Sequence, residues 1–421
     1  MIRTIIDVHV LQTVPPSNLN RDDTGTPKSA FYGGVRRARV SSQAWKRATR
    51  QAFNAFLDPR ELGVRTRQVP VLLASRIRSS DPSLSEESAL SLAVETLSAA
   101  TGSKFPIPLR KAEKAKKNDL PEPPPESTYL MFLSRRQLDG LAEHAVSGAA
   151  DIKAFFKDKA NKEKAKKIAD TQHSVDVALF GRMVADSTDL NVDAAAQVAH
   201  ALSVHAVENE SDYFTAVDDM NEDGEDSGAG MIGTVEFNSA TLYRYAALDV
   251  DRLRDNLGAG VRPDERDDQP VHRAVDAFLR AFVQSMPTGQ ANTFANQTLP
   301  DAVIVTLRSA RPISFVGAFE EPVVAPLGTG GHLRGACTQL LAYVSDIEKA
   351  YGVSGDPSWV LRAGTATEPL AVLGTAVGLE ELVREVGESV LTRLSGRTPE
   401  ARTAADGAPQ ARMPEARTAP A

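Results

Sequence analysis

Short runs of apolar, β-branched residues recur along the chain and predict strands. The first run covers residues 2–11 (IRTIIDVHVL) and stops before Pro15 and Pro16. Such side chains pack well on a pleated, half-buried surface. The same pattern predicts strands at 35–40, 174–185, 241–250 and 302–308.

Apolar residues that recur every three or four positions predict helices elsewhere in the chain. One such helix covers about 41–57, and Ser41 or Ser42 suits its N-cap because a hydroxyl can accept a free backbone N–H. Further helices are predicted at 84–101, 135–147, 150–170, 192–205, 270–285 and 332–350.

Three segments have the composition of loops or disordered chain. Residues 18–34 contain several glycines and Pro27, which predicts a loop. Residues 110–127 (RKAEKAKKNDLPEPPPES) join a lysine run to a proline run, and they predict a mobile surface loop. Residues 396–421 repeat PEARTA and contain few large apolar side chains, so we expect a disordered, low-complexity tail.

The composition is that of a soluble globular protein, with 421 residues, 42% hydrophobic and 24% charged. A single cysteine, Cys337, argues against a disulfide framework and a cysteine-rich zinc site, and fits a reducing cytosol. No signal-peptide cleavage site follows residues 1–14, and no apolar run is long enough to span a membrane. We therefore expect a cytoplasmic protein without a cofactor or metal.

The net charge of −7 hides a strong asymmetry. Residues 1–50 contain nine Lys and Arg against three Asp, which gives +6 and leaves −13 for the rest of the chain. A concentrated basic region on an acidic protein can localise an anionic partner.

The helix predicted at 41–57 has two chemically different faces on a helical wheel of about 100° per residue. The apolar face, which should pack on the core, contains Trp45, Ala48, Ala52 and Phe56. The opposite face presents Gln43, Lys46, Arg47 and Arg50. The helix contains no Asp or Glu that could neutralise these cations.

Three further cations, Arg36, Arg37 and Arg39, lie just before this helix. Without an acid among them they should repel one another unless an anion binds. A basic helix face is commonly only solvated, yet the free N–H groups at a helix N-terminus also suit a phosphate. We interpret the region as a surface that binds a nucleic-acid backbone, which positions a strand without reading its sequence.

The order of these residues is more specific than their charge. Residues 9–48 (HVLQTVPPSNLNRDDTGTPKSAFYGGVRRARVSSQAWKRA) resemble closely the N-terminus of CasC, the repeated backbone subunit of the type I-E CRISPR Cascade complex. The resemblance continues in VDVALFGRM (175–183), SDYFTAVDD (211–219), GTVEFNSATLYRYA (233–246) and around 287–297. It weakens in 60–170 and after about 350.

The resemblance implies an α+β fold with an RRM-like (ferredoxin-like) palm, a helical fingers insertion and an extended thumb. It places the palm in 1–59, 191–206 and 238–395, the fingers in 60–190, and the thumb in 207–237. It also implies a subunit without catalytic activity that assembles as several copies in a helical filament along crRNA. The other implied partners are target DNA and Cascade subunits of the CasA, CasB, CasD and CasE families.

The resemblance also implies roles for individual residues. Contacts to the guide backbone fall on Arg21, Lys28, Gln43, Lys46 and Arg47. The displacement of one base at regular intervals falls on Met183 and on Tyr213–Phe214, where the family can have Trp first. With the physical argument, the predicted RNA-binding residues are Asn20, Arg21, Lys28, Arg36, Arg37, Arg39, Gln43, Lys46, Arg47, Arg50, Met183, Tyr213, Phe214 and Thr215.

Three alternatives stay open from the residues themselves. Tyr213 and Phe214 could equally be a local hydrophobic anchor. The acids around them are expected to face the basic surface of the next copy; they are Glu208, Glu210, Asp212, Asp218 and Asp219. The acidic run 218–226 would be the site if the chain were a metal-dependent endoribonuclease. The basic patch could also bind an acidic protein surface.

Overall fold

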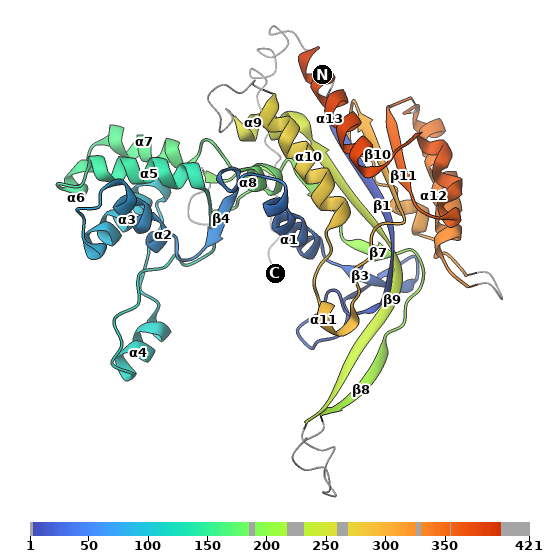
Figure 1. Ribbon diagram of the computed structural model, residues 1–421, viewed down its shortest axis with the longest axis horizontal. Coiled ribbons are helices and arrows are strands. Elements are labelled where there is room, and N and C mark those ends of the chain that lie inside the picture. Colours follow the sequence, from blue (N-terminus) through green and yellow to red (C-terminus); the bar gives the residue numbers. More distant parts are fainter. Residues whose placement is uncertain are drawn as a thin grey trace, which may run out of the picture.

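A large, mostly antiparallel sheet forms the centre of the computed structural model, which describes residues 3–184, 190–216, 231–258, 268–325, 330–353 and 355–396 (Figure 1). Within these residues the sheet has ten strands. They are β1 (Ile5–Ser17), β2 (Ser29–Tyr32), β3 (Val35–Val40), β6 (Ala196–Val198), β7 (Ala201–Ser203), β8 (Glu210–Ala216), β9 (Met231–Asp249), β10 (Ala302–Arg308), β11 (Ser358–Arg362) and β12 (Thr375–Ala376).

The strands follow the order β12-β11-β10-β1-β9-β7-β3-β2, and β6 and β8 also pair with β9. Strand β1 is central and antiparallel to both neighbours, so that Ile5 lies opposite Asp249 of β9 and Arg308 of β10. Only the β11–β12 pair is parallel among the described strands. Pro15 and Pro16 lie within β1, at a shift in its register with β9, where a missing N–H is tolerated.

Successive residues of a strand point to opposite sides of the sheet, and helices cover the apolar side chains on both of its faces. Ile6, Val8 and Val10 pack beneath α10 (Gln269–Gln284) and α13 (Leu379–Ser395). On the other side, Leu11 packs with α12 (Leu333–Tyr351), η4 (Val316–Phe319) and η5 (Thr365–Leu373). The first face also carries α1 (Ser42–Ala52), η1 (Phe53–Ala55), α8 (Val175–Phe180) and α9 (Val250–Leu257).

A helical lobe with its own hydrophobic core lies beside the sheet (Figure 1). It comprises β4 (Gly63–Thr66), α2 (Val69–Ser80), α3 (Glu86–Thr101), α4 (Leu109–Lys117), β5 (Met131–Ser134), α5 (Arg135–Ser147), α6 (Ile152–Phe155) and α7 (Lys159–Ala169), and η2 (Pro59–Glu61) leads into it. The carboxylate of Asp176 in α8 connects the lobe to the sheet layer, since it accepts the Gly63 N–H at 2.9 Å and pairs with Arg50 of α1.

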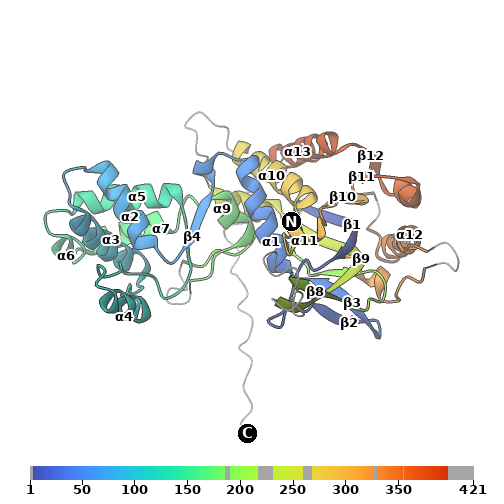
Figure 2. The same ribbon diagram turned by 60° about the horizontal axis from the view of Figure 1, so that its bottom comes forward.

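Strand β8 and the first part of β9 form a hairpin that projects beyond the sheet (Figures 1 and 2). Its base is held by the Asn18 side-chain amide, which donates to the Glu236 carbonyl at 2.9 Å. Phe237 also contacts Phe294 of the short helix α11 (Ala291–Phe294), with ring centroids 5.7 Å apart.

Several sequence predictions are confirmed. Strands at 35–40 and 302–308 and helices at 84–101, 135–147, 270–285 and 332–350 appear with small differences at their ends. The strand predicted at 241–250 is the second half of β9, which begins at Met231 and ends at Asp249. The predicted helix at 150–170 is divided into α6 and α7, and the helix at 41–57 ends at Ala52 before the 3₁₀ turn η1.

Other predictions are wrong. Residues 174–185 contain helix α8, not a strand, and the alanine-rich segment 192–205 contains β6 and β7, not a helix, because pairing with β9 overrides alanine's helix propensity. The predicted loop 18–34 includes β2. The predicted loop 110–127 begins with most of helix α4. Residues 397–421, predicted to be disordered, lie outside the described residues.

Candidate nucleic-acid interface

The N-terminus of α1 is held by side chains from two other parts of the chain. The Ser41 hydroxyl accepts the Ala44 N–H at 3.3 Å as the helix cap. The Ser41 N–H donates to Oδ1 of Asn20 at 2.9 Å, and the Ser42 N–H donates to Nδ1 of His200 at 3.1 Å. Asn20 therefore positions the helix, which is a local role beside the RNA contact predicted for it.

The inner face of α1 rests on a buried cation. Trp45 is only 1% exposed, and the Arg244 guanidinium carbon lies 3.7 Å from the centre of its ring. Arg244 also donates to Oε1 of Gln12 at 2.6 Å and to the Phe282 carbonyl. Burial lowers the pKa of Arg244 to about 9. The predicted core face of the helix is thus confirmed at Trp45 and Ala48.

The predicted core position of Phe56 is wrong, because the helix ends before it. Phe56 is 38% exposed, whereas Phe53 is fully buried and stacks on Phe180 at 5.9 Å. The wheel assumed a continuous helix to residue 57, and the 3₁₀ turn η1 changes the direction of each side chain after Ala52.

The outer face of α1 presents Gln43 and Arg47 to solvent, as predicted. Lys46 is half-buried, its ammonium lies 5.9 Å from the centre of the Phe180 ring, and burial lowers its pKa. Arg50 has a tertiary partner that the helix sequence does not reveal: its Nε lies 2.9 Å from Asp176, and its guanidinium stacks over Phe132 at 4.7 Å.

Strand alternation places Arg36 on one face of β3 and Arg37 and Arg39 on the other. Arg36 is exposed and lies 5.8 Å from the Phe31 ring, while Arg39 is half-buried and donates to the Ser29 carbonyl at 3.2 Å. Arg37 is fully buried, and burial lowers its pKa. Its guanidinium donates to the backbone carbonyls of Tyr32, Ser203, Phe319 and Glu320 at 2.8 to 3.2 Å.

The prediction that Arg37 binds RNA is therefore wrong. Four carbonyl dipoles take the place of the anion that the sequence argument required for this side chain. The signal that could have revealed this is the odd–even alternation of VRRARV, which sends neighbouring arginines to opposite faces.

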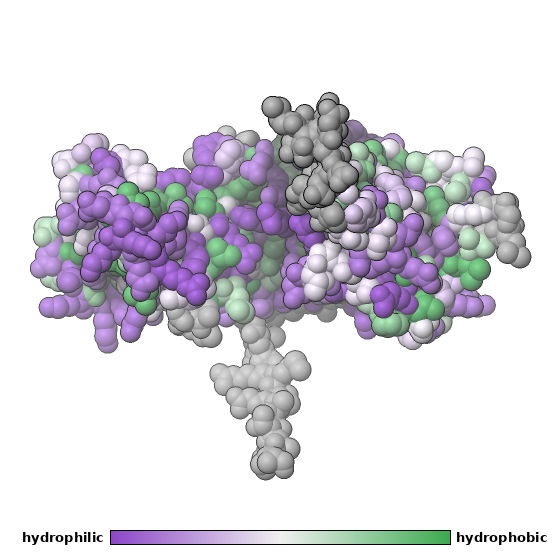
Figure 3. Space-filling model, turned by 90° about the horizontal axis from the view of Figure 1, so that it is seen from below, coloured by the Kyte–Doolittle hydropathy of each residue, from purple (hydrophilic) through white to green (hydrophobic). Residues whose placement is uncertain are grey.

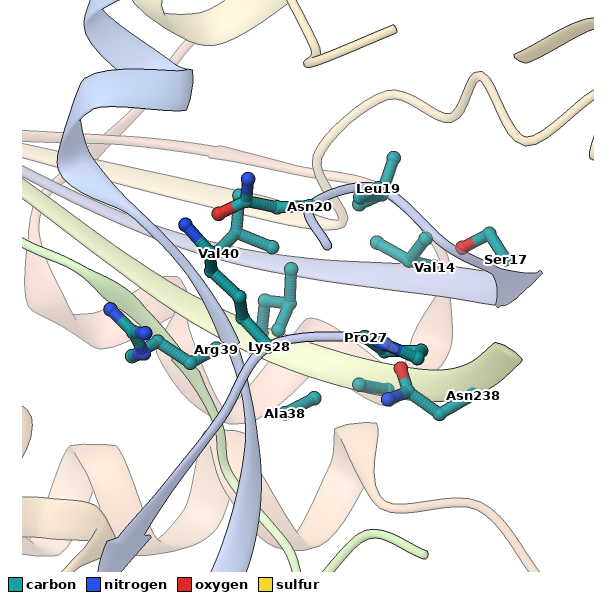
Figure 4. A pocket seen from close by; sticks show the side chains of 12 residues that line it. Val14, Ser17, Leu19, Asn20, Pro27, Lys28, Ala38, Arg39, Val40 and Asn238 are labelled. Atoms are coloured by element: carbon teal, nitrogen blue, oxygen red, sulfur yellow. The ribbon is translucent and has the colours of Figure 1, made fainter. Parts of the chain in front are cut away.

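A small hollow of about 20 Å³ lies beside the start of α1 (Figure 4). Lys28 and Arg39 line it with Asn20, and their nitrogen ends lie on the side away from Ser17 and Asn238. Desolvation lowers the pKa of the nearby His200, and the charges of Arg39 and Lys28 lower it further. Two cations and a helix N-terminus thus converge at one surface. Arg21 is exposed in the loop that leads to Lys28.

Met183 lies on the surface of a firmly anchored segment. It is 80% exposed, whereas its neighbours Arg182 and Val184 are buried. Arg182 pairs through its backbone with Val192, and its guanidinium donates to the Leu190 carbonyl at 2.8 Å. Burial lowers the pKa of Arg182 to about 10. The segment therefore presents an apolar thioether to solvent on a rigid support.

The hairpin separates the two aromatic residues onto opposite faces. Tyr213, 62% exposed, lies opposite Thr234, while Phe214 lies opposite Gly233. A Cβ at Gly233 would lie 2.4 Å from the Phe214 ring, so this ring covers the glycine. Neighbouring strand residues point to opposite sides, and the two rings cannot enter the same gap between bases.

The two faces also differ in charge. The face of Tyr213 carries Ser211 and Thr215 on β8 and one acid, Glu236, opposite Ser211 on β9, while the face of Phe214 carries two acids, Glu210 and Asp212. The acidic run 218–226, which includes Asp218 and Asp219, lies outside the described residues. The alternative of an endoribonuclease rests on this run as its carboxylate site, so that site lies outside them too.

The described residues contain no group of three or more His, Cys, Asp or Glu side chains that could hold a metal ion. Among their helices, none is both long and apolar enough to cross a membrane.

The chain matches one family model over most of its length and is similar to chains of solved structures. The model of the CT1975-like protein family matches residues 6–385. One chain, described as "CRISPR RNA-guided surveillance complex, pre-nicking", is similar with a TM-score of 0.75 and 33% identity, over 91% of this chain and 100% of its own. Another, from a "CRISPR RNA-guided surveillance complex", has a TM-score of 0.66 and 29% identity, over 90% and 99%. No curated protein matches the sequence.

Proposed function

The chain belongs to the CT1975-like protein family, and on that basis we propose that it is a guide-RNA-binding backbone subunit of a type I-E Cascade complex. The resemblance to a Cascade subunit is confirmed by the family match and by the two surveillance-complex chains. In this proposal the chain binds crRNA, catalyses no reaction itself, and acts in the cytoplasm in antiviral defence.

We propose that the sheet is an RRM-like palm, the helical lobe the fingers, and the β8–β9 hairpin the thumb. Two features support this proposal. Four neighbouring strands of the sheet lie in the order β10-β1-β9-β7. Helix α1 comes after β1 in the chain and α10 comes after β9, as the two helices of an RRM come after its first and third strands. The opposite sheet face is covered by α12, η4 and η5. RNA is therefore assigned to the edge marked by α1, not to an open sheet face.

The convergence of cations at the start of α1 carries the proposal. Lys28, Arg39 and Arg47 have no carboxylate partner among the described residues. Lys28 and Arg39 line the hollow beside the N-terminus of α1, where the helix dipole also favours anions, and Arg47 is exposed on the outer face of the same helix. Phosphates of a single strand would bind here one after another. Such contacts hold the strand whatever its sequence, so the bases stay available for pairing with target DNA.

Met183 and Tyr213 suit the displacement of a base from this strand. Met183 offers an exposed, uncharged side chain on an anchored segment. Tyr213 offers one on the hydroxyl-bearing face of the hairpin. Insertion of such a side chain beside a base compensates for lost base stacking. Phe214, on the acidic face, is assigned to contact with the next copy and not to the RNA.

The acidic face of the hairpin supports head-to-tail assembly along the RNA. Glu210 and Asp212 would meet the basic surface of the next copy, and a heterologous contact of this kind extends into a filament. The CasA, CasB, CasD and CasE families and target DNA are the remaining partners in this proposal.

Nuclease digestion of the purified full-length chain tests this function. If the chain lines crRNA in several copies, RNA of a defined length should stay protected, and removal of that RNA should separate the copies. A chain that protects no RNA, yet binds an acidic protein through the same surface, would contradict the proposal.

A further inference from the structure

The turn between α10 and β10 is a segment that the RNA surface at α1 does not include. It contains the short helix α11 and lies at the base of the β8–β9 hairpin (Figure 1). Figure 3 shows the end of the molecule from which the hairpin projects, and both hydrophilic and hydrophobic side chains reach the surface there. Beneath this surface the turn meets the end of β1 and the base of the hairpin.

The backbones approach closely where the turn meets the end of β1. A Cβ at Gly289 would lie 2.6 Å from the Asn18 carbonyl oxygen, so only a glycine fits. The side-chain amide of Asn18 donates to the Glu236 carbonyl at the hairpin base, at 2.9 Å. Within the turn, Nδ2 of Asn296 donates to the Gly289 carbonyl at 3.3 Å. These contacts gather the amides of Asn18, Asn296 and Gln290, the neighbour of Gly289, at one site, which we call the amide junction.

The amide junction contains three buried oxygen atoms that accept no hydrogen bond from the described residues. They are Oδ1 of Asn18, Oε1 of Gln290 and Oδ1 of Asn296. Asn18 and Asn296 are only 1% and 0% exposed. Their amide nitrogens donate to carbonyls, which fixes the side of each amide that carries the oxygen. No other buried side-chain amide oxygen of the described chain lacks a partner, so these unpaired acceptors are specific to the junction.

The backbone of the turn is also held in an unfavourable conformation. Gln290 has φ of 46° and Ala295 has φ of 47°, in the left-handed region that residues with a Cβ rarely adopt. Such conformations persist where the surrounding contacts impose them, and they are common at turns that hold a ligand. The contacts at the amide junction therefore shape the turn against its own backbone preference.

The chemistry of the junction favours a cation over an ordered water. All three unpaired atoms are acceptors, whereas one water molecule has only two hydrogen atoms to donate. A cation attracts the lone pairs of all three oxygens at once. The ligands are neutral amides, which excludes a close match to magnesium or calcium, because those ions are held mainly by carboxylates. Uncharged oxygens suit an ion of potassium's class, whose hydration shell they can replace.

We propose that Asn18, Gln290 and Asn296 bind a monovalent cation of about the size of potassium. The ion joins the turn to the end of β1 and to the base of the hairpin, since Asn18 contacts both. It satisfies three buried oxygens that no donor of the described residues reaches. The site does not depend on RNA binding, and it holds whatever the function of the chain.

Unfolding of the purified full-length chain by urea tests the site. The measurement compares potassium chloride with tetramethylammonium chloride at equal ionic strength, because the larger ion cannot approach three amide oxygens together. The denaturation midpoint should rise with potassium concentration and then level off, as it does for a ligand that binds only the folded chain. Tetramethylammonium should give no such rise. In crystals soaked with thallium(I), which replaces potassium, an anomalous peak should lie in contact with the three oxygens.

A pair of matched variants assigns the effect to the junction. Gln290→Ala removes one ligand and should weaken potassium binding at least about tenfold, as the loss of a group that supports a bound metal does. Asn256→Ala is the control. Its amide also donates to two backbone carbonyls, at 3.0 and 2.8 Å, but its oxygen is not a buried, unpaired acceptor. This control should lower stability and keep the full response to potassium.

Four results would overturn the proposal. The two salts could give the same midpoints, Gln290→Ala could keep the full response to potassium, or the control could lose as much of it. Crystals that show ordered water at the junction and no thallium peak would assign the three oxygens to water alone. The thallium experiment uses the unchanged chain, so it decides the question even if Gln290→Ala does not fold.

Discussion

The guanidinium of Arg244 lies 3.7 Å from the centre of the Trp45 ring, beneath the helix to which we assign the RNA backbone. A charge far from water is tolerated here because two rings and two hydrogen-bond acceptors surround it. Trp45 and Arg244 thus join α1 to the sheet. The position of the outer cations depends on this buried pair.

Trp45→Ala should lower the free energy of unfolding by about 3–5 kcal/mol, because it leaves a cavity and removes one face of the cation site. Chemical denaturation of the purified chain measures this. Phe56→Ala is the matched control, an aromatic residue that a wheel places on the same face but that is exposed, and it should cost less than about 1 kcal/mol. Equal losses would contradict the assigned packing.

Two arginines of the basic region should respond in opposite ways. Arg37→Ala leaves four carbonyls without their donor, those of Ser203 and Phe319 in buried hydrogen bonds, and should destabilise the fold by at least about 2 kcal/mol. Arg47→Ala removes an exposed side chain and should change stability by no more than about 0.5 kcal/mol while lowering RNA affinity. Denaturation and RNA titration of both variants distinguish these roles, and a stable Arg37→Ala chain with weakened RNA binding would contradict them.

The two faces of the hairpin should separate RNA binding from assembly. Tyr213→Ala should weaken RNA binding by about 1–3 kcal/mol through lost stacking, with little effect on contact between copies. Asp212→Lys should instead weaken that contact, since it places a cation against a basic surface. RNA titration and sedimentation velocity measure the two effects. If Tyr213→Ala disrupts assembly and Asp212→Lys only RNA binding, the faces are assigned the wrong way round.

Acid should destabilise the fold through His205. Desolvation lowers the pKa of this imidazole to about 4, and its Nε2 accepts the Thr241 N–H, so the folded chain keeps it neutral. The unfolded chain binds a proton near pH 6.5, and this contribution to stability is therefore present above pH 6.5 and is lost as pH falls toward 4. The full loss is at most about 3 kcal/mol.

His205→Gln keeps an acceptor for Thr241 without a titrating group. Its free energy of unfolding should change less between pH 7 and pH 5 than that of the unchanged chain. His173, whose pKa burial also lowers to about 4, stays in both proteins and accounts for part of the remaining slope. An identical pH dependence in the two proteins would exclude His205 as a contributor.

The absence of catalysis is a prediction of the proposed function. Labelled repeat RNA incubated with the purified chain should stay intact with and without magnesium. A specific cleavage product from the chain alone would show instead that it is an endoribonuclease.

The sequence predicted the strands and helices with clear periodicity, together with the core face of α1 at Trp45. It could not predict β6 and β7, because their alanine-rich sequence forms strands only through pairing with β9. Nor could it predict that Arg50 pairs with Asp176, 126 positions away, or that Arg37 donates to the carbonyls of Ser203 and Glu320, 166 and 283 positions away. The separation of Tyr213 from Phe214 follows from strand alternation, but only once residues 210–216 are known to be a strand.

The central claim, that α1 binds an RNA backbone, is tested most directly by the salt dependence of RNA affinity in the double variant Lys46→Ala and Arg47→Ala. Arg311→Ala with Lys349→Ala provides the charge-matched control. The account predicts weaker binding by the first variant to every RNA sequence, and a slope of log K against log salt that is shallower by about 1.4, with no change in the control. If the α1 variant binds RNA as tightly and with an unchanged slope, α1 is not the RNA-binding surface.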